Sequence, residues 1–283
     1  MSYNFLETSG EQRCSAPRIG LLNIMPSSVA EKTERNWQIA LGNDVALVPL
    51  RFDEDQRLAH GDADWLLGYA PFSDVRDELD GIVVTGANAE RSLDGTALPF
   101  AAIHNIDALR EVIDWAESDA RLAIYSCLSS HIALGHLFGA ERALQRSKTF
   151  GVFCHDVIVD DVLTEGLEMP LQAPHSRWGT IHPHVLEQID EVDILVEGYE
   201  PGWLLAKRQR PTGLSIFLQG HPEYGPLDLH DEYIRDAGQG GNPPVGYYKT
   251  NDLSHEPVYR WEKDSIRLFA NITRILTTQN ILA

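Results

Sequence analysis

The chain has 283 residues, of which 43% are hydrophobic and 23% charged, and its formal net charge at pH 7 is −19. This composition is ordinary for a globular protein, and the chain is long enough to bury a large core without disulfides or metals. The acidity argues against nucleic acid and anionic membranes as partners, because both are bound through clusters of basic residues.

Strands and helices alternate along the first half of the chain. We expect a poorly structured lead-in over residues 1–17. Apolar runs predict strands at residues 18–26, 45–52, 79–87 and 122–126. Apolar positions at helical spacing predict helices at residues 31–41 and 106–118, and a third helix directly after Cys127. This alternation is typical of an α/β fold with a doubly wound, mostly parallel sheet and helices on both faces.

The pattern changes after Gly139. Further strands are predicted at residues 150–159, 194–205 and 214–218, a loop at residues 238–244, and a last helix at residues 258–276. We find no internal repeat, and we expect residues 18–283 to form a single domain.

Four positions follow directly on predicted strands: Pro26, Gly86, Cys127 and His221. In open α/β sheets, ligands bind beyond the carboxyl ends of the strands. We therefore expect these four positions to converge on one crevice.

The cysteines and the N-terminus bear on the compartment. Cys14, Cys127 and Cys154 form no disulfide framework, which favours the reducing cytoplasm. The first residues lack the basic and apolar segments of a signal peptide, and no apolar run approaches the ~20 residues that cross a bilayer. We expect a cytoplasmic protein.

Cys127 carries the strongest chemical signal. It lies at a predicted strand-to-helix turn, a geometry that exposes a nucleophile and sets it where the helix dipole favours a thiolate. His221 follows a later strand, and Glu223, two residues on, can engage the second ring nitrogen because Pro222 rigidifies the turn. A lone cysteine is more often a small core residue. The three together predict covalent catalysis through sulfur, with His221 as the base.

Other polar residues have weaker signals. Cys154 and His155 are adjacent, so strand alternation directs them to opposite faces. His131 is expected on a helix surface rather than in a pocket. We predict no metal site, because the histidines lack zinc-ligand spacing with cysteines; they are His175, His182, His184 and His221. Two basic clusters are candidates for binding a phosphate-bearing co-substrate, or are plain surface charge: Lys207, Arg208 and Arg210, and Arg142, Arg146 and Lys148.

Several segments in register resemble the homoserine O-acyltransferase family of methionine biosynthesis, which is related to class I glutamine amidotransferases. They lie at residues 22–26, 33–34, 81–87, 127, 148–153, 174–177, 220–224, 232–236 and 261–271. The resemblance runs from about Ile19 to Leu276. It implies a glutamine amidotransferase-like (flavodoxin-like) fold and a homodimer. It also implies that no cofactor is permanently bound, and that the co-substrate is acyl-CoA, either acetyl-CoA or succinyl-CoA.

The resemblance also implies roles for single residues. Cys127 would carry the acyl group as a thioester, His221 would act as the base and Glu223 would orient it. Backbone N–H groups near Leu128 and from the Met25 turn would hold the oxyanion. Arg235 would clamp the carboxylate of the amino-acid acceptor, by default homoserine, although a surface ion pair with Glu232 or Asp236 is the plain alternative. The same crevice would be lined by Lys148, Ser176 and Arg177.

Glu90 matches the family position associated with the choice of acyl group. A glutamate there resembles the acetyl-using members, since its carboxylate would repel the second carboxylate of a succinyl group. We therefore expect acetyl-CoA as the preferred donor.

The sequence departs from the family at the nucleophile loop and the substrate rim. Leu128 replaces the usual tryptophan after the cysteine, Ser28 replaces a lysine, and Trp178 replaces a histidine. Three alternatives therefore stay open: a paralogue with a different hydroxyl acceptor, an amidotransferase-like cysteine hydrolase or glutaminase, and a non-catalytic binding protein.

Overall fold

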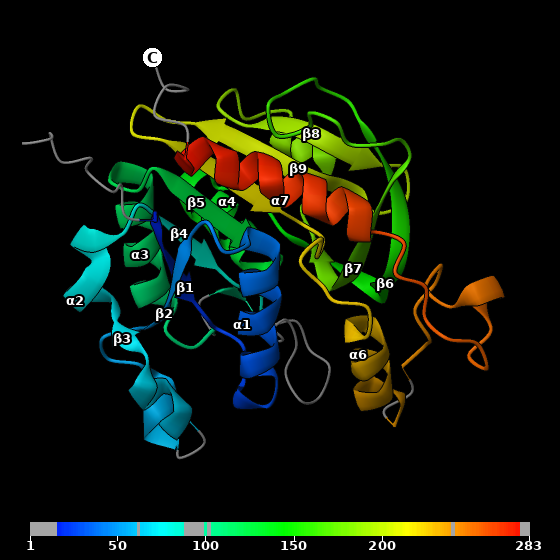
Figure 1. Cartoon of the computed structure of the whole chain (residues 1–283), viewed down its shortest axis with the longest axis horizontal. Coiled ribbons are helices and arrows are strands. Elements are labelled where there is room, and N and C mark those ends of the chain that lie inside the picture. Colours follow the sequence, from blue (N-terminus) through cyan, green and yellow to red (C-terminus); the bar gives the residue numbers. More distant parts are fainter. Residues whose placement is uncertain (1–15, 61–62, 88–98, 101–102, 239–240, 278–283) are drawn as a thin grey trace, which may run out of the picture.

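A computed structural model describes residues 16–60, 63–87, 99–100, 103–238 and 241–277. Within these ranges ten strands form one sheet in the order β3-β2-β1-β4-β5-β10-β9-β8-β6-β7 (Figure 1). The parallel part contains β1 (Arg18–Leu22), β2 (Ala46–Arg51), β3 (Ala70–Pro71), β4 (Gly81–Val84), β5 (Leu122–Ser126) and β10 (Leu214–Leu218). The antiparallel part contains β6 (Ala143–Val157), β7 (Leu171–Thr180), β8 (Asp193–Gly198) and β9 (Gly202–Gln209).

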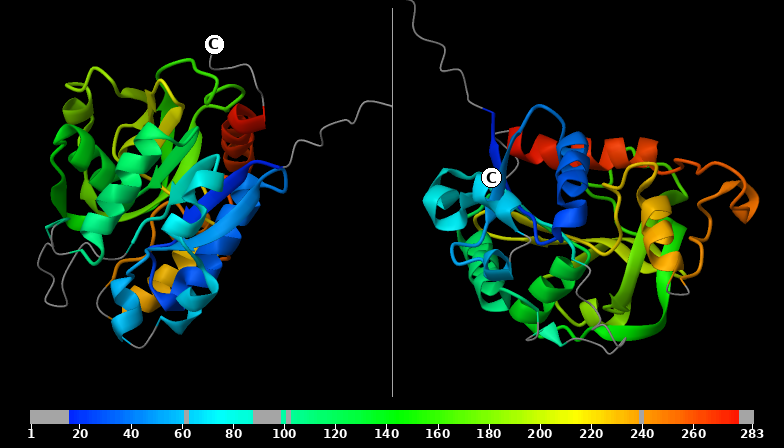
Figure 2. Two further views of the ribbon diagram at one scale, coloured as in Figure 1. Left: turned by 90° about the vertical axis from the view of Figure 1, so that its left-hand side faces the viewer. Right: turned by 90° about the horizontal axis from the view of Figure 1, so that it is seen from below.

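Helices cover both faces of the sheet. In the right-hand view of Figure 2, α1 (Ser27–Leu41) and α7 (Glu262–Thr277) lie on one side, and α3 (Ile106–Ser118) and α4 (Leu128–Phe138) on the other. The other helical segments are α2 (Phe72–Val75), α5 (Pro183–Leu186), α6 (Asp228–Ala237) and the 3-10 turns Gln56–His60, Asp64–Gly68, Arg76–Glu78 and Lys249–Asn251. The expected α/β fold with a mostly parallel sheet and helices on both faces is confirmed.

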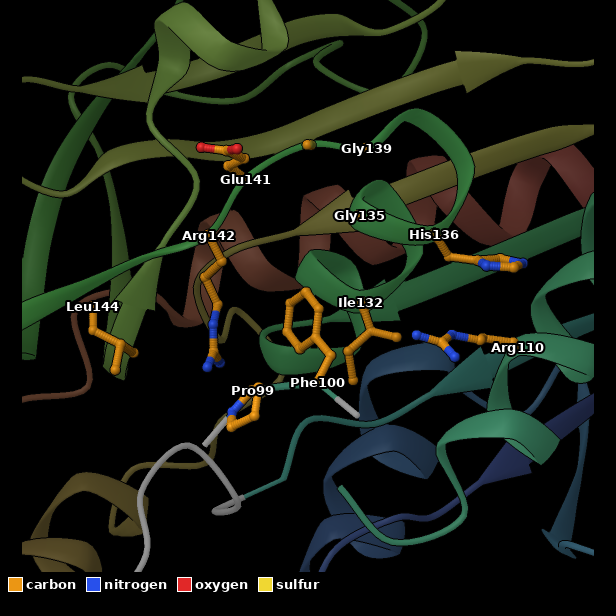
Figure 3. A pocket seen from close by; sticks show the side chains of 11 residues that line it. Pro99, Phe100, Arg110, Ile132, Gly135, His136, Gly139, Glu141, Arg142 and Leu144 are labelled. Carbon is orange, nitrogen blue, oxygen red and sulfur yellow. The ribbon is translucent and has the colours of Figure 1, made fainter. Parts of the chain in front are cut away.

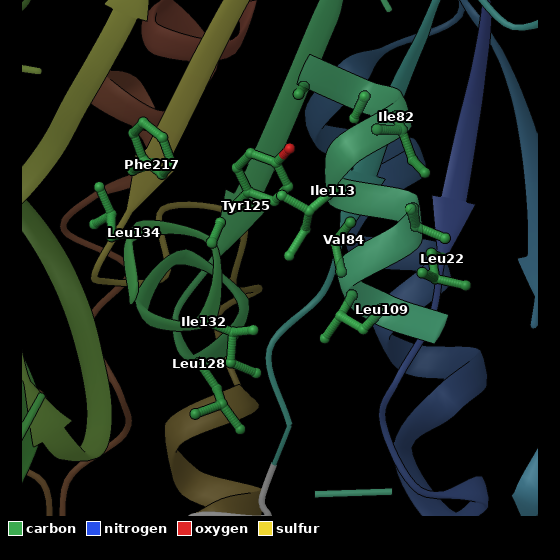
Figure 4. Close-up of a cluster of buried hydrophobic side chains, with 14 of the residues drawn as sticks. Leu22, Ile82, Val84, Leu109, Ile113, Tyr125, Leu128, Ile132, Leu134 and Phe217 are labelled. Atoms are coloured by element: carbon green, nitrogen blue, oxygen red, sulfur yellow. The ribbon is translucent and has the colours of Figure 1, made fainter. Parts of the chain in front are cut away.

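Each face of the sheet has its own apolar core. On one face, Trp37 of α1 packs edge-on against Phe269 of α7, with ring centroids 5.7 Å apart. On the other, Leu109 and Ile113 of α3 and Ile132 of α4 pack over the strands (Figure 4). Strands buried on both sides read as continuous apolar runs, and for this reason β5 and β10 were predictable to the residue.

The structure differs from the sequence predictions at several elements, among them β6, which begins at Ala143 rather than at residue 150. Helix α1 begins at Ser27, a full turn before the predicted start. The predicted run 194–205 is two strands, because the chain reverses before Gly202, whose φ of +73° favours glycine. Strand β7 and helix α6 were not predicted, and both supply residues to the site below. No helix in the described ranges is long and apolar enough to span a membrane.

Candidate active site

A pocket of about 50 Å³ lies where β1, β4, β5 and β10 end. Its walls include Met25 after β1, Gly86 after β4, Cys127 after β5 and His221 after β10. Helices α1 and α6 face each other across it, joined by an ion pair from Lys32 to the buried Asp228 at 2.9 Å. The carboxyl ends of four neighbouring strands thus meet at one crevice, as the topology rule requires.

Cys127 occupies a sharp turn between β5 and α4. Its backbone has φ 53° and ψ −112°, a conformation that non-glycine residues rarely adopt. Hydrogen bonds hold the turn: the Cys127 N–H donates to the carbonyl of Leu218 at 2.7 Å, and the Ser129 hydroxyl donates to the Val84 carbonyl at 2.7 Å. The thiol is therefore fixed at the N-terminal end of α4, at the pocket wall.

His221 lies beside the thiol and is held on several sides. Its side chain hydrogen-bonds Cys127. Its Nδ1 lies 2.8 Å from Glu223 Oε1, which also accepts a hydrogen bond from the Ser126 hydroxyl at 3.2 Å. The ring of Tyr224 stacks on the imidazole with centroids 4.2 Å apart. These contacts fix both the tilt of the ring and the nitrogen that faces Cys127.

The charge state of His221 follows from these neighbours. Burial disfavours the imidazolium, but the negative charges of Glu223 and Cys127 outweigh burial and raise the pKa of His221 well above its ordinary value. A cysteine beside a histidine that is itself oriented by a buried carboxylate is the arrangement of a cysteine nucleophile with its base.

Glu232, on α6, forms a polar hub in the pocket wall. It accepts hydrogen bonds from Lys148 Nζ at 3.1 Å, from the Tyr224 hydroxyl at 2.6 Å and from the Ser176 hydroxyl. Burial would raise the pKa of Glu232, but the charge of Lys148 and the hydrogen bonds from Ser176 and Tyr224 hold it below its ordinary value. We therefore expect an ionised carboxylate here. From the sequence, Glu232 was expected only as a possible salt-bridge partner of Arg235; its position three residues before Arg235, one helical turn away, was the available signal for a shared site.

Arg235 lines the same pocket and is 41% exposed. Its guanidinium donates to both carboxylate oxygens of Asp236, at 2.7 and 3.1 Å, and lies 3.7 Å from Glu232. Arg235 therefore both lines the pocket and forms the ion pair with Asp236. A substrate carboxylate that binds Arg235 would have to take the place of Asp236.

The sequence is similar to known proteins along nearly its whole length. A model of the homoserine O-succinyltransferase family matches residues 6–281. The chain belongs to this family. The homoserine O-succinyltransferase of Shewanella pealeana is 33% identical over 267 residues, covering 90% of this chain and 80% of that protein. That of Alteromonas mediterranea is 27% identical over 276 residues, covering 94% and 84%. The chain is thus an acyltransferase of the homoserine O-succinyltransferase type.

Solved structures with the same fold are glutamine amidotransferase-like. A glutamine amidotransferase from Thermotoga maritima aligns with a TM-score of 0.56 at 11% identity, covering 92% of this chain and 96% of that one. A putative GMP synthase protein from Thermoplasma acidophilum aligns with a TM-score of 0.55 at 17% identity, covering 93% and 94%. At such identities the likeness concerns the fold, and it confirms the expected fold class.

Two expectations about the pocket need correction. Arg177 is buried on β7, and its guanidinium donates to the carbonyls of Gly179, at 2.8 Å, and of Pro201, so it does not reach the pocket. Met25 lines the pocket, but its N–H donates to Asn23 Oδ1 at 3.1 Å and is not directed at an oxyanion. Lys148 reaches the site through Glu232, and Ser176 lines the pocket directly.

The expectation that His131 lies on a helix surface was wrong. The first two turns of α4 are buried all round, and His131 is fully buried there, with Nε2 3.1 Å from Gln219 Oε1. Burial, together with the charge of Arg177, lowers the pKa of His131 to about 3, so the ring is neutral.

The preference for acetyl-CoA finds no support in the family. The matched relatives are named succinyltransferases, and Glu90, on which the expectation rested, lies outside the described residues. Among the residues that are described, no cluster of histidine, cysteine and carboxylate side chains is arranged to hold a metal ion.

Proposed function

We propose that the protein transfers an acyl group from acyl-CoA to the side-chain hydroxyl of homoserine or a similar amino acid, through a thioester on Cys127. The observation that carries this proposal is the composition of one pocket. The pocket contains Cys127, His221 and Glu223, which are arranged for acyl transfer. It also contains Glu232, whose carboxylate suits the ammonium group of an amino acid, and Arg235, whose guanidinium suits the carboxylate.

In the first half-reaction, His221 holds the proton of the Cys127 thiol, and the thiolate attacks the carbonyl of the acyl-CoA thioester. The tetrahedral intermediate collapses as the sulfur of CoA leaves, taking the proton from His221. In the second, His221 removes the proton of the acceptor hydroxyl, whose oxygen attacks the acyl-enzyme, and the proton then returns to Cys127. Glu223 keeps the imidazole oriented through both halves.

The oxyanion needs donors on the Cys127 side of the pocket. The N–H of Leu128, at the first turn of α4, is one. We propose the backbone of Gly86 as the second, in place of Met25. Gly86 packs so close that a Cβ there would lie 3.2 Å from the Cβ of Cys127 and 3.7 Å from Cε1 of His221. A side chain at this position would obstruct the reacting carbonyl.

The small free volume of the active pocket favours a mechanism in which the acyl donor and the acceptor bind one after the other. About 50 Å³ is far below the few hundred Å³ of a typical small-molecule site, so the pocket must widen to admit either substrate, and it must widen less if they enter in turn. A covalent acyl-enzyme allows entry in turn, because CoA departs before the amino acid enters.

The homodimer and the cytoplasmic location of the protein stay predictions.

The donor is proposed from the relatives, whose names favour succinyl-CoA over acetyl-CoA. Incubation with each CoA thioester, followed by intact-protein mass and peptide mapping, should reveal an acyl adduct on Cys127. Homoserine should then discharge it with formation of the O-acyl product. CoA release without transfer to any hydroxyl amino acid would indicate a hydrolase instead. Absence of an adduct and of CoA release with every donor would refute the proposal.

Arg235→Ala is expected to raise the KM for the amino-acid acceptor by about 10- to 100-fold, the value of a charge-assisted pair. Acylation of Cys127 by acyl-CoA should be unaffected, because the donor half-reaction does not use the clamp. Steady-state kinetics with single-turnover acylation separates the two effects. Arg76→Ala is the matched control, since Arg76 also pairs with the next residue, Asp77, but lies outside the pocket. Loss of acylation in Arg235→Ala would contradict the clamp.

A further inference from the structure

A second, larger cavity of about 530 Å³ lies alongside α4 (Figure 3). Its floor is the helix surface at Ile132 and Gly135, and Phe100 stands over that surface. Arg142 and Arg110 enter from opposite sides, and the guanidinium of Arg142 lies over the Phe100 ring, 4.8 Å from its centroid. The described lining therefore includes two arginines, an aromatic ring and one carboxylate, Glu141, so arginines outnumber acidic side chains here in a protein whose overall charge is −19.

Arg142 is packed into this position. A Cβ at Gly179 of β7 would lie 2.9 Å from Cδ of Arg142, so the absence of a side chain there leaves room for the arginine stem. A guanidinium stacked on an aromatic ring and supported along its stem is pre-organised, and it loses little freedom when it binds an anion.

Two elements connect the cavity to the active site. Along α4, Ile132 and Gly139 lie about 7 and 18 Å from Cys127 at a rise of about 1.5 Å per residue. Arg142 directly precedes β6, and at the spacing of an extended chain it lies at most about 20 Å from Lys148, which contacts Glu232 in the active pocket. Arg146 lies between these two residues in the chain, on β6. Three basic residues of this segment therefore lie, in chain order, between the cavity and the contact with Glu232.

These distances match the arm of CoA. The chain between its thiol and its diphosphate has about thirteen bonds, comparable to about four residues of extended backbone, and so reaches about 15 Å. A thioester at Cys127 would therefore bring the diphosphate and the 3′-phosphoadenosine to the region of the cavity. That end of CoA carries several negative charges and a planar base, which suit guanidinium groups and an aromatic ring.

We propose that this cavity binds the phosphoadenosine end of the acyl-CoA donor, with Arg142 as the main phosphate ligand, Arg110 as a second cation and Phe100 as the surface for the base. The assignment rests on the proposed function, because it is the thioester at Cys127 that places the nucleotide here. It explains how an active pocket with little free volume recognises a large donor: most of the donor is held outside it.

The test compares two donors that share one acyl group, succinyl-CoA and succinyl-pantetheine, which lacks the nucleotide. In Arg142→Ala, the KM for succinyl-CoA should rise at least about tenfold, as for loss of a hydrogen bond to a charged group, while the KM for succinyl-pantetheine stays unchanged. Arg142→Lys keeps the charge and guards against misfolding; it should show a smaller rise. Arg76→Ala, at an exposed site away from both pockets, should match wild type.

Direct binding gives an independent readout. Adenosine 3′,5′-bisphosphate, followed by calorimetry, should bind wild type and compete with succinyl-CoA, and Arg142→Ala should weaken both effects by about tenfold or more. An unchanged KM in Arg142→Ala, equal losses with the two donors, or failure of wild type to bind the bisphosphate would overturn the assignment. If neither donor acylates wild type, the proposed function fails, whereas bisphosphate binding still decides whether the cavity takes a nucleotide.

Discussion

Cys127→Ala should lower the rate of acyl transfer by about 10⁴-fold or more, because removing the nucleophile of a concerted catalytic set forfeits nearly all of its effect. The alternative route, direct attack of the acceptor hydroxyl on acyl-CoA, would need both substrates in the small pocket at once. Product formation followed by mass spectrometry gives the rate, and the same instrument should detect no acyl adduct on the variant.

Cys154→Ala is the matched control. Cys154 is also a free cysteine but is exposed on β6, outside the active pocket, so its removal should leave turnover unchanged. Cys127→Ser adds a second comparison, since a hydroxyl keeps the size and the hydrogen bond but is a far weaker nucleophile. Near-normal turnover in Cys127→Ala, or an adduct that persists in it, would exclude the thioester mechanism.

Glu223→Gln should lower turnover by about 10³-fold or more, because the amide no longer stabilises the imidazolium or fixes the ring nitrogen that faces Cys127. It should also change the pH dependence. Glu223 is the leading cause that raises the pKa of His221, so in the variant that pKa should fall. In a plot of acylation rate against pH, the rate falls at high pH as His221 loses its proton. In the variant this fall should begin at a lower pH. Acylation rates across pH, with NMR titration of the ring, measure the shift.

His221 also makes the stability of the fold depend on pH. Because the folded-state pKa of His221 lies above its unfolded value, its protonation contributes to the free energy of unfolding below the unfolded pKa, and the contribution is lost as pH rises through the folded one. Glu223→Gln should reduce this contribution, whereas Glu31→Gln, at an exposed site on α1, should not. A pH limb in Glu223→Gln that coincides with that of wild type would show that Glu223 does not set the charge of His221.

The parts of the fold that follow simple rules were predictable. Strands β5 and β10 are short apolar runs buried on both faces, and α3 has an apolar stripe at helical spacing. Since these strands set the carboxyl edge of the sheet, the grouping of Gly86, Cys127 and His221 at one crevice could also be expected.

Elements stabilised by tertiary contacts were not predictable. Strand β7 contains His175 and Arg177, polar residues that interrupt its apolar pattern, yet both are buried and hydrogen-bonded to each other at 3.3 Å. Helix α6 is short and largely polar and buries only residues of its first turn, so few apolar positions mark it in the sequence. The direction of the Arg177 side chain and the burial of His131 likewise depend on neighbours that are distant in the sequence.

The backbone at Cys127 has a consequence for how this protein can change. Holding a non-glycine residue at a φ of 53° costs about 1–3 kcal/mol, a sizeable share of a net stability that is typically about 5–15 kcal/mol. Glycine would relieve that cost and remove the nucleophile in one step. Selection for thermal robustness and selection for turnover therefore oppose each other at this position. In a related protein that no longer needs the reaction, replacement of this cysteine by glycine would increase stability, so we expect the cysteine to be lost early while the surrounding fold is kept.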